Sequence, residues 1–153
     1  MAAPDRARTF ASSVYYLDPM AAVEWLERAF GFERSMMITE PDGALTHAEL
    51  SFGDGHVTIG AEWADWTRSP ASIGGKCSQN LSVQLDDDVD AHCARARAAG
   101  AVIQQEPEDQ FYGDRTYRAA DPEGHIWSFA RTIRFVSREE AEAASGLTIE
   151  GWR

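Results

Sequence analysis

The sequence lacks long apolar runs and has few cysteines. No segment approaches the roughly 20 consecutive apolar residues that cross a bilayer, which argues against a membrane partner. The two cysteines, Cys77 and Cys93, form neither a CxxC pair nor another zinc-binding spacing. Residues 1–8 are polar and lack the apolar segment of a secretion signal. We therefore expect a cytoplasmic protein without a cysteine-bound metal.

Basic residues are also scarce. The chain has 14 lysines and arginines against 25 aspartates and glutamates, for a formal net charge of −11. Such a surface repels a phosphate backbone, which argues against a nucleic acid partner. The acidity would attract a cationic ligand, although solubility alone accounts for it. Hydrophobic residues make up 44% of the 153 residues, enough for the core of one domain.

What the sequence does contain is an internal repeat. A gapless shift of 69 positions brings many identical residues into register. The matched pairs include Ser13 and Ser82, Asp18 and Asp87, Gly31 and Gly100, Gly55 and Gly124, and His56 and His125. Aspartate is favoured at helix N-caps and glycine just past helix ends. The pairs at 18/87 and 31/100 therefore predict one helix of about three turns in each copy.

Strand-like segments flank each predicted helix, and turns containing Pro or Gly separate them. Each copy reads β-α-β-β-β. We predict an α+β fold of two tandem βαβββ modules that form a curved mixed sheet with a central cup and helices outside. The expected single domain, 1–153, has module one at about 9–62, a linker at 63–79, module two at about 80–131 and a C-terminal tail at 132–153.

Two βαβββ modules in one chain resemble the vicinal oxygen chelate superfamily, which includes glyoxalase I, extradiol dioxygenases and bleomycin resistance proteins. The segment DPEGHIW at 121–127 is similar to that family's Asp-Pro-x-Gly turn into its last strand. Segments 46–50, 109–115 and 136–140 resemble the PhnB-like, glyoxalase-type branch. The fold hosts many chemistries, so the resemblance implies a family more than an activity.

Enzymes of that superfamily hold a divalent metal with four side chains, one from the first and one from the last strand of each module. The family pattern places these positions at Ala11, Ile59, Asn80 and Ser128. Alanine and isoleucine have no ligating atom, and serine and asparagine are poor ligands compared with imidazole and carboxylate. The resemblance therefore implies a dismantled metal site, and we expect no metal and no other cofactor.

The histidines are candidates for other chemistry. His47 and Glu49 lie two residues apart on one predicted strand and so share a face of the sheet. They would serve as a chelating pair or as acid and base in proton transfer, or simply as a hydrogen-bonded polar pair that lines a pocket or interface. His56 and His125 follow turn glycines, which predicts a structural role, and His92 is expected to be solvated on its helix.

Aromatic residues are numerous in the predicted linker and loops. They would offer flat surfaces to a planar or cationic ligand, or cover the ends of the sheet or a dimer contact. The candidates are Trp63, Trp66, Phe111, Tyr112 and Tyr117.

Arg115 is a candidate for gripping a carboxylate or phosphate, with a structural salt bridge to a nearby aspartate as the alternative. Ser128 should point into the central cup of the fold, where we expect it to converge with His47, Glu49, Phe111, Tyr112, Arg115 and Tyr117. Strand alternation places either Thr116 and Arg118 or Arg115 and Tyr117 on the inner face. The repeat favours the first pair, whereas the family-like motif favours Arg115. We predict that Arg115 reaches into the cup.

Three functions remain open at this point. The first is a metal-independent protein that binds and sequesters a planar or cationic small molecule. The second is an enzyme, such as a lyase or isomerase, in which His47 and Glu49 transfer protons and Arg115 holds an anionic substrate. The third is a structural or regulatory dimer with a vestigial pocket. The resemblance implies a homodimer, and the apolar tail at 132–153 must cover something.

Overall fold

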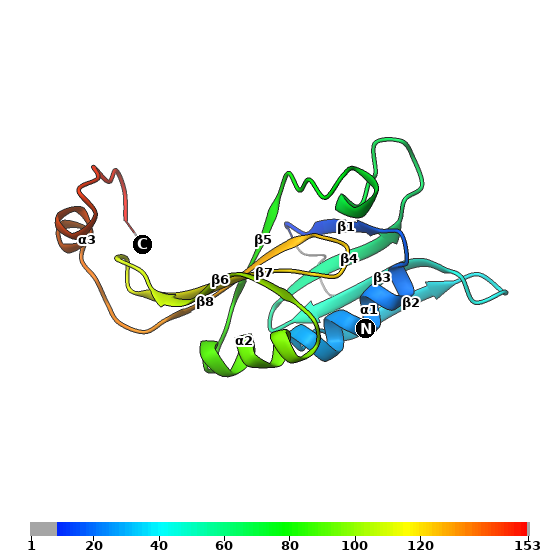
Figure 1. Cartoon of the computed structure of the whole chain (residues 1–153), viewed down its shortest axis with the longest axis horizontal. Helices are drawn as coiled ribbons and strands as arrows, with labels where there is room; N and C mark the ends of the chain where they lie inside the picture. The colour runs from blue at the N-terminus through cyan, green and yellow to red at the C-terminus, as the bar shows by residue number, and fades with distance from the viewer. Residues whose placement is uncertain (1–8, 153) are drawn as a thin grey trace, which may run out of the picture. The chain divides into compact units, whose positions relative to one another are not determined.

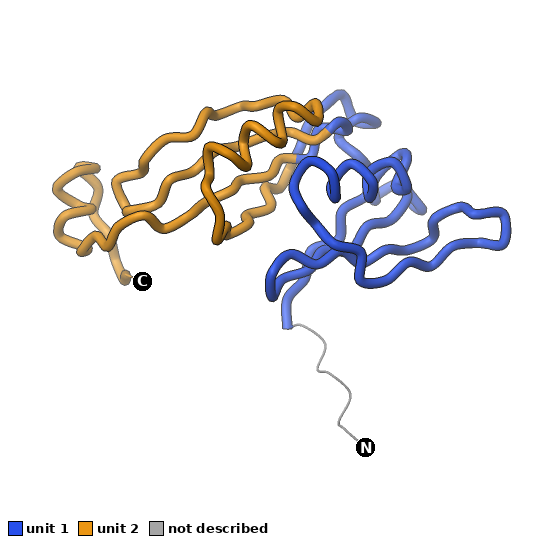
Figure 2. The backbone as a smooth tube through the Cα atoms, turned by 90° about the horizontal axis from the view of Figure 1, so that it is seen from below, with its two compact units in different colours: residues 1–77, 122–125 blue, residues 78–121, 126–153 orange. Residues whose placement is uncertain are grey.

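Each half of the chain forms its own four-stranded mixed sheet with a helix on one face. The computed structural model describes residues 9–152. These form two compact units: the first ends at Cys77 but includes Pro122–His125, and the second takes in Ser78–Asp121 and the residues from Ile126 onward (Figure 2). The predicted α+β class with two tandem modules is confirmed. Among residues 9–152, no helix is long and apolar enough to cross a bilayer.

The first unit contains the first module. Its elements are β1 (Ser12–Tyr16), α1 (Pro19–Phe30), β2 (Glu33–Thr39), β3 (Leu45–Phe52), β4 (Gly55–Ala61) and the short 3-10 helix η1 (Pro70–Ser72) (Figure 1). The strands lie in the order β1-β4-β3-β2, with β1 parallel to β4 and the other pairs antiparallel. Because α1 contacts all four strands, it covers one face of this sheet.

Helix α1 begins and ends where the sequence predicts. The Asp18 carboxylate accepts a hydrogen bond from the backbone N–H of Ala21 at 3.0 Å, and Pro19 occupies the first turn. Gly31 ends the helix with a φ of 84°, a left-handed conformation that glycine adopts without strain. The buried side of the helix, which includes Leu26, packs into the core of the first unit.

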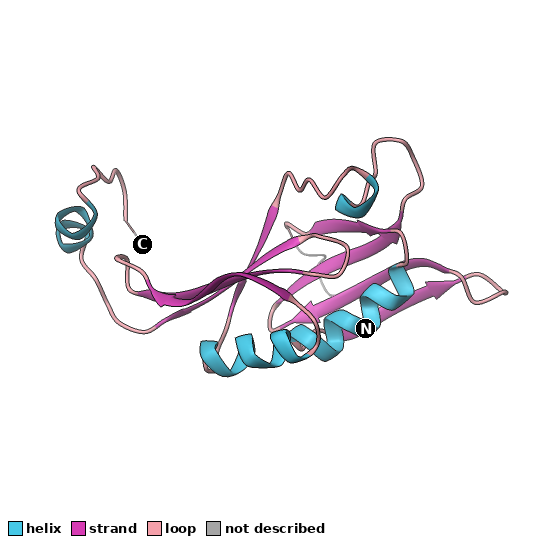
Figure 3. Ribbon diagram, viewed as in Figure 1, coloured by secondary structure: helices cyan, strands magenta, loops and turns pink. Residues whose placement is uncertain are grey.

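The second unit repeats this arrangement. Its elements are β5 (Asn80–Gln84), α2 (Val89–Ala98), β6 (Val102–Asp109), β7 (Asp114–Ala120), β8 (Ile126–Thr132) and α3 (Arg138–Ser145). The strand order is β5-β8-β7-β6, and α2 lies along one face of the sheet, against β6, β7 and β8 (Figure 3). Asp88, not Asp87, caps α2: its carboxylate accepts from the backbone N–H of Ala91 at 2.7 Å.

The gapless register of the repeat holds up to the turn of the last hairpin in each module and is wrong after that turn. Ser51 pairs with His56, whereas Ala120, which is 69 positions after Ser51, pairs with Ile126. The second hairpin therefore has one residue more than the first. Ile126 is the structural counterpart of His56, and His125 lies inside the longer turn.

The C-terminal tail folds back beside the loop between β6 and β7. Gly113 in this loop has a φ of 96°, and its carbonyl oxygen accepts from the backbone N–H groups of Ile133 and Arg134. Val136 is buried, and its carbonyl accepts from the Trp152 indole at 2.9 Å. Ser137 and Glu140 form the predicted capping box of α3.

Candidate functional site

A polar pocket lies on the second sheet, on the face turned away from α2. Its volume is about 430 Å³, within the range of small-molecule sites. It is lined by Asn80, Ser82, Gln84, Gln105, Glu108, Gln110, Tyr112, Asp114, Thr116, Tyr117, Arg118, Ser128, Phe129 and Ala130. We call this side of the sheet the open face, and define it by the side chains of Asn80, Ser82, Thr116, Arg118 and Ser128.

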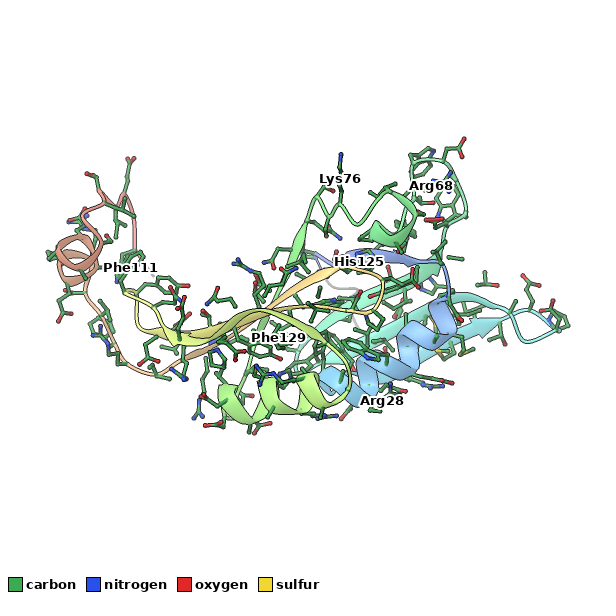
Figure 4. All side chains as sticks on the ribbon, viewed as in Figure 1. Arg28, Arg68, Lys76, Phe111, His125 and Phe129 are labelled. Atoms are coloured by element: carbon green, nitrogen blue, oxygen red, sulfur yellow. The ribbon has the colours of Figure 1, made fainter. Side chains whose placement is uncertain are left out.

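The faces of β7 are assigned by its contacts with the helix. The Tyr117 hydroxyl lies 2.6 Å from Nδ1 of His92 on α2, and the Tyr117 ring stacks on Phe129, which points toward α2 in Figure 4. Tyr117 therefore faces the helix. Since successive side chains of a strand alternate, Thr116 and Arg118 face the other way, onto the open face.

A chain of hydrogen bonds joins three residues of the open face. Nε of Arg118 donates to Oγ of Ser128 at 3.1 Å, and Oγ of Ser128 donates to Oδ1 of Asn80 at 2.7 Å. The Asn80 amide in turn donates to Oγ of Ser82 at 3.3 Å. Asn80 and Ser128, which the family pattern assigns to the second module's metal positions, thus meet side by side across β5 and β8.

Amide side chains occupy the other end of the pocket. Gln105 and Gln110 both donate to Oγ1 of Thr116, at 3.1 and 3.0 Å. Gln110 also donates to the Glu108 carboxylate at 3.1 Å. These contacts place neutral donors and acceptors around the pocket. The charged residues of its lining are Arg118, the exposed Glu108 and the buried Asp114.

Arg115 lies on the helix side, which differs from the arrangement we expected. Its guanidinium donates to both carboxylate oxygens of Asp90 on α2, at 2.7 and 2.9 Å, and to Asp109 at 2.8 Å. The hydrogen bond from Arg115 lowers the pKa of Asp90. With two carboxylates already bound, Arg115 is arranged as a structural residue. The geometry favours the pair that the repeat indicated, Thr116 and Arg118.

The metal position expected on the last strand of the first module, Ile59, also needs correction. Ile59 is fully buried (0% exposed) and pairs with Ala48, so it belongs to the core beneath α1. One residue earlier, Thr58 lies on the opposite face, where its hydroxyl donates to Oγ of Ser13 at 2.7 Å. Thr58 pairs with Glu49 as Ser128 pairs with Arg118, so Thr58 is the counterpart of Ser128.

The side chains at these positions do not suit a divalent metal. Corrected for register, the family positions hold Ala11, Thr58, Asn80 and Ser128, and none of these side chains is an imidazole or a carboxylate. Nor do three His, Cys, Asp or Glu side chains gather anywhere within residues 9–152 in a way that would hold a metal ion.

His47 and Glu49 lie together on β3 of the first unit. Nε2 of His47 is 3.4 Å from Oε1 of Glu49, and both side chains are about one-third exposed (36% and 34%). Their neighbours Ala48 and Leu50 are fully buried toward α1, so the pair shares the face that carries Thr58. Whether this pair joins the open face of the second unit in one site remains a prediction.

The aromatic candidates fall into three groups. Trp63 and Trp66 are exposed (64% and 74%) in the loop after β4, with their rings edge to face at 4.6 Å. Phe111, labelled in Figure 4 at the tip of the β6–β7 loop, packs edge to face with Tyr112 at 5.1 Å, and Tyr112 lines the pocket. Tyr117 is fully buried against α2.

Two histidines are buried and bonded in ways that the sequence did not indicate. His92 was expected to be solvated, but it lies between α2 and the sheet against Tyr117 and Phe129. In the first unit, Nε2 of His125 lies 2.7 Å from the carbonyl oxygen of Tyr15 (His125 is labelled in Figure 4). The structural role expected for His125 therefore involves a strand backbone and not its own turn.

Comparisons with known proteins agree with this architecture. The family model described as the Glyoxalase/Bleomycin resistance protein/Dioxygenase superfamily matches residues 11–129. An uncharacterized protein of Mycobacterium bovis is 34% identical over 139 residues, which cover 88% of this chain and 90% of that protein.

Two solved structures are similar. TioX from Micromonospora sp. ML1 is 32% identical with a TM-score of 0.66, covering 83% of this chain and all of TioX. TnmS3, an antibiotic binding protein from Streptomyces sp. CB03234, is 20% identical with a TM-score of 0.63, covering 85% of this chain and 99% of TnmS3, which shows a shared fold.

Proposed function

Because the chain belongs to the glyoxalase/bleomycin resistance protein/dioxygenase superfamily, we propose that it binds a small molecule on the open face of its second sheet without using a metal. The observation that carries this proposal is the pocket of about 430 Å³, whose polar residues are mostly amides and hydroxyls. Such groups orient an organic ligand through hydrogen bonds. TnmS3, which shares the fold, is an antibiotic binding protein, so this architecture is compatible with such a role.

We propose further that the ligand is planar and that binding sequesters it. Tyr112 lines the pocket and offers an aromatic face to the ligand. The exposed Trp63 and Trp66 rings offer a separate stacking surface, within the first unit. A cationic ligand, the other kind expected from the sequence, is less well supported. The guanidinium of Arg118 lies on the open face and would repel it, although the exposed Glu108 and the buried Asp114 would attract it. We also place the chain in the PhnB-like branch, on its motifs at 46–50, 109–115 and 136–140.

Three planar compounds of similar size test this proposal: N-methylquinolinium, 2-naphthol and 2-naphthoate, which are a cation, a neutral molecule and an anion. We expect at least one to shift the backbone amide NMR signals of the open face, with a Kd measurable by calorimetry. Thr116→Trp fills the pocket and should abolish that binding. Thr46→Trp, at an exposed position on β3 of the first sheet, should leave it unchanged. Binding that Thr116→Trp leaves intact would contradict the site.

A second function is supported by one observation, the contact of 3.4 Å between His47 and Glu49. A histidine oriented by a carboxylate is a suitable general base, and the pair would act on a small anionic substrate. An enzyme of this kind would show turnover that depends on both residues, whereas sequestration would survive His47→Gln and Glu49→Gln. Ligand release without chemical change, checked by mass spectrometry, distinguishes the two functions.

A further inference from the structure

We infer that Arg118 is an anion-binding residue, and that the ligand proposed above carries a carboxylate or a phosphate. This inference rests on the proposed function, because it concerns the same pocket. It follows from the charge balance around Arg118, the direction of its hydrogen bonds and the neutral character of the groups beside it.

Arg118 lines the pocket and, within residues 9–152, forms no ion pair with an acidic side chain. Within residues 9–152, five arginines form ion pairs with aspartate or glutamate, and Arg118 forms none. The paired arginines are Arg34, Arg68, Arg97, Arg115 and Arg138. Carboxylates are plentiful in a chain with 25 acidic and 14 basic residues, yet none of the described ones pairs with Arg118, so its charge is available to a ligand.

The hydrogen bonds around Arg118 fix its guanidinium while leaving two of its nitrogens for a ligand. A serine hydroxyl has a single hydrogen, and that of Ser128 is donated to Oδ1 of Asn80. The Ser128 oxygen therefore accepts from Nε of Arg118 through a lone pair. No described residue accepts from the Nη atoms of Arg118, and these N–H groups can donate to the two oxygens of a planar anion.

The neighbouring groups hold Arg118 without neutralising it. Ser128 and Asn80 carry no charge, so they orient the guanidinium but leave its positive charge uncompensated. Two carboxylates line the pocket, and neither forms an ion pair with Arg118. Glu108 accepts from Gln110 at 3.1 Å, and the buried Asp114 accepts from Oγ1 of Thr132 at 2.8 Å. An incoming anion would supply the missing counter-charge. Asn80 and Ser128, at positions that the family pattern assigns to metal ligands, would thus position a guanidinium instead.

The inference is tested by measuring Kd values for 2-naphthoate, 2-naphthol and inorganic phosphate by calorimetry. We expect wild-type protein to bind 2-naphthoate at least about tenfold more tightly than 2-naphthol, as a charge-assisted hydrogen bond implies. Naphthoate and phosphate should both shift the Nε–H NMR signal of Arg118. Arg118→Gln should weaken naphthoate binding at least about tenfold and change naphthol binding by less than about twofold.

Two further variants separate charge from position. Ser128→Ala keeps the charge but removes the anchor, so we expect a smaller loss of naphthoate affinity and a displaced Arg118 Nε–H signal. Arg131→Gln removes an exposed arginine of β8 that does not line the pocket. It should change neither the affinity for naphthoate nor the Arg118 Nε–H signal. Amide NMR spectra confirm that each variant is folded.

The outcomes distinguish this inference from the proposed function. If naphthol or N-methylquinolinium binds the open face as tightly as naphthoate, or if Arg118→Gln weakens all three equally, the anion-binding role is wrong and the small-molecule site stands. If neither phosphate nor any of the three planar compounds perturbs the open face, both proposals are wrong.

Discussion

The imidazole of His92 and the phenol of Tyr117 meet in the core of the second unit, with Nδ1 2.6 Å from the hydroxyl oxygen. Both residues are buried, and Phe129 packs against both rings. The contact ties α2 to β7. It also keeps the side chain of Tyr117 on the helix face, which leaves Thr116 and Arg118 on the open face.

Tyr117→Phe should therefore destabilise the protein. Removal of the hydroxyl leaves Nδ1 of His92 without that partner in a buried site, which costs about 1–3 kcal/mol of unfolding free energy. Urea denaturation at pH 7 measures the change. Tyr15→Phe serves as the control, because Tyr15 is half-buried and its hydroxyl has no described partner. Equal stability of Tyr117→Phe and wild type would show that the hydrogen bond contributes nothing net.

The same tyrosine gives a prediction at alkaline pH. Burial raises the pKa of Tyr117 above its usual value of 10.0. The unfolded chain therefore loses this proton at a lower pH than the folded chain, and stability falls as the pH rises above about 10. Tyr117→Phe lacks this contribution, so its unfolding free energy should fall less steeply between pH 9 and about 11 than that of the wild type. Parallel slopes for the two proteins would contradict the prediction.

Glu62 gives a matching prediction at acid pH. Its carboxylate accepts from the hydroxyl of Ser72 and from the backbone N–H of Ser69, and these hydrogen bonds lower its pKa below 4.5. The stabilisation is present above about pH 4.5 and is lost as the pH falls through the lower folded value. Glu62→Gln should reduce the drop in urea midpoint between pH 6 and about 3. Glu33→Gln, an exposed site on β2, should not.

Gly113→Ala should destabilise the second unit more than Gly100→Ala. The two glycines have nearly equal φ angles, 96° and 97°, so an alanine is strained equally at both. A Cβ at Gly100 meets nothing within 4 Å, whereas a Cβ at Gly113 collides with the carbonyl oxygen of Arg134. We expect Gly100→Ala to cost about 1 kcal/mol and Gly113→Ala at least about 2 kcal/mol more, by thermal or urea unfolding. Equal costs would mean that the tail shifts freely away.

The assembly prediction concerns the tail and a second copy of the chain. Phe135 is 84% exposed, and Ile133 and Leu147 are also exposed within the described residues. Apolar surface of this kind is typical of a contact that is covered in the assembly. Light scattering at micromolar concentration should give the mass of a dimer, and Phe135→Ser should shift it toward the monomer. Phe10→Ser, at an equally exposed site (89%) in the first unit, is the control. A wild-type monomer would contradict this prediction.

The sequence predicted the fold because the signals that end helices and strands are local. Asp18 and Gly31 bracket α1 through contacts within one turn, and the structure agrees. The gapless register failed because an added residue in a turn leaves no local signal. The alternation of apolar residues carried the missing information. Val57 and Ile59 match Trp127 and Phe129 at a shift of 70, and these four residues are buried.

The candidate site was predicted less well, for a related reason. Whether Arg115 or Arg118 faces the pocket depends on which side of β7 packs against α2. That choice is settled by Tyr117 and Phe129, which are large and apolar and lie next to His92 in the core. In a strand with an arginine on each face, the sequence alone identifies the faces only if the buried aromatic residue is recognised first.

The internal pairing of β1 with β4 has a consequence for synthesis of the chain. All four strands of the first sheet lie within residues 12–61, so this sheet can form while the second module is still being translated. Glu123, however, lies in the turn between β7 and β8, and it accepts from the backbone N–H of Leu17 and the hydroxyl of Ser69 in that first unit. The first unit therefore gains these two hydrogen bonds only after the β7–β8 turn has been synthesised, even though the residues of its own sheet are made much earlier.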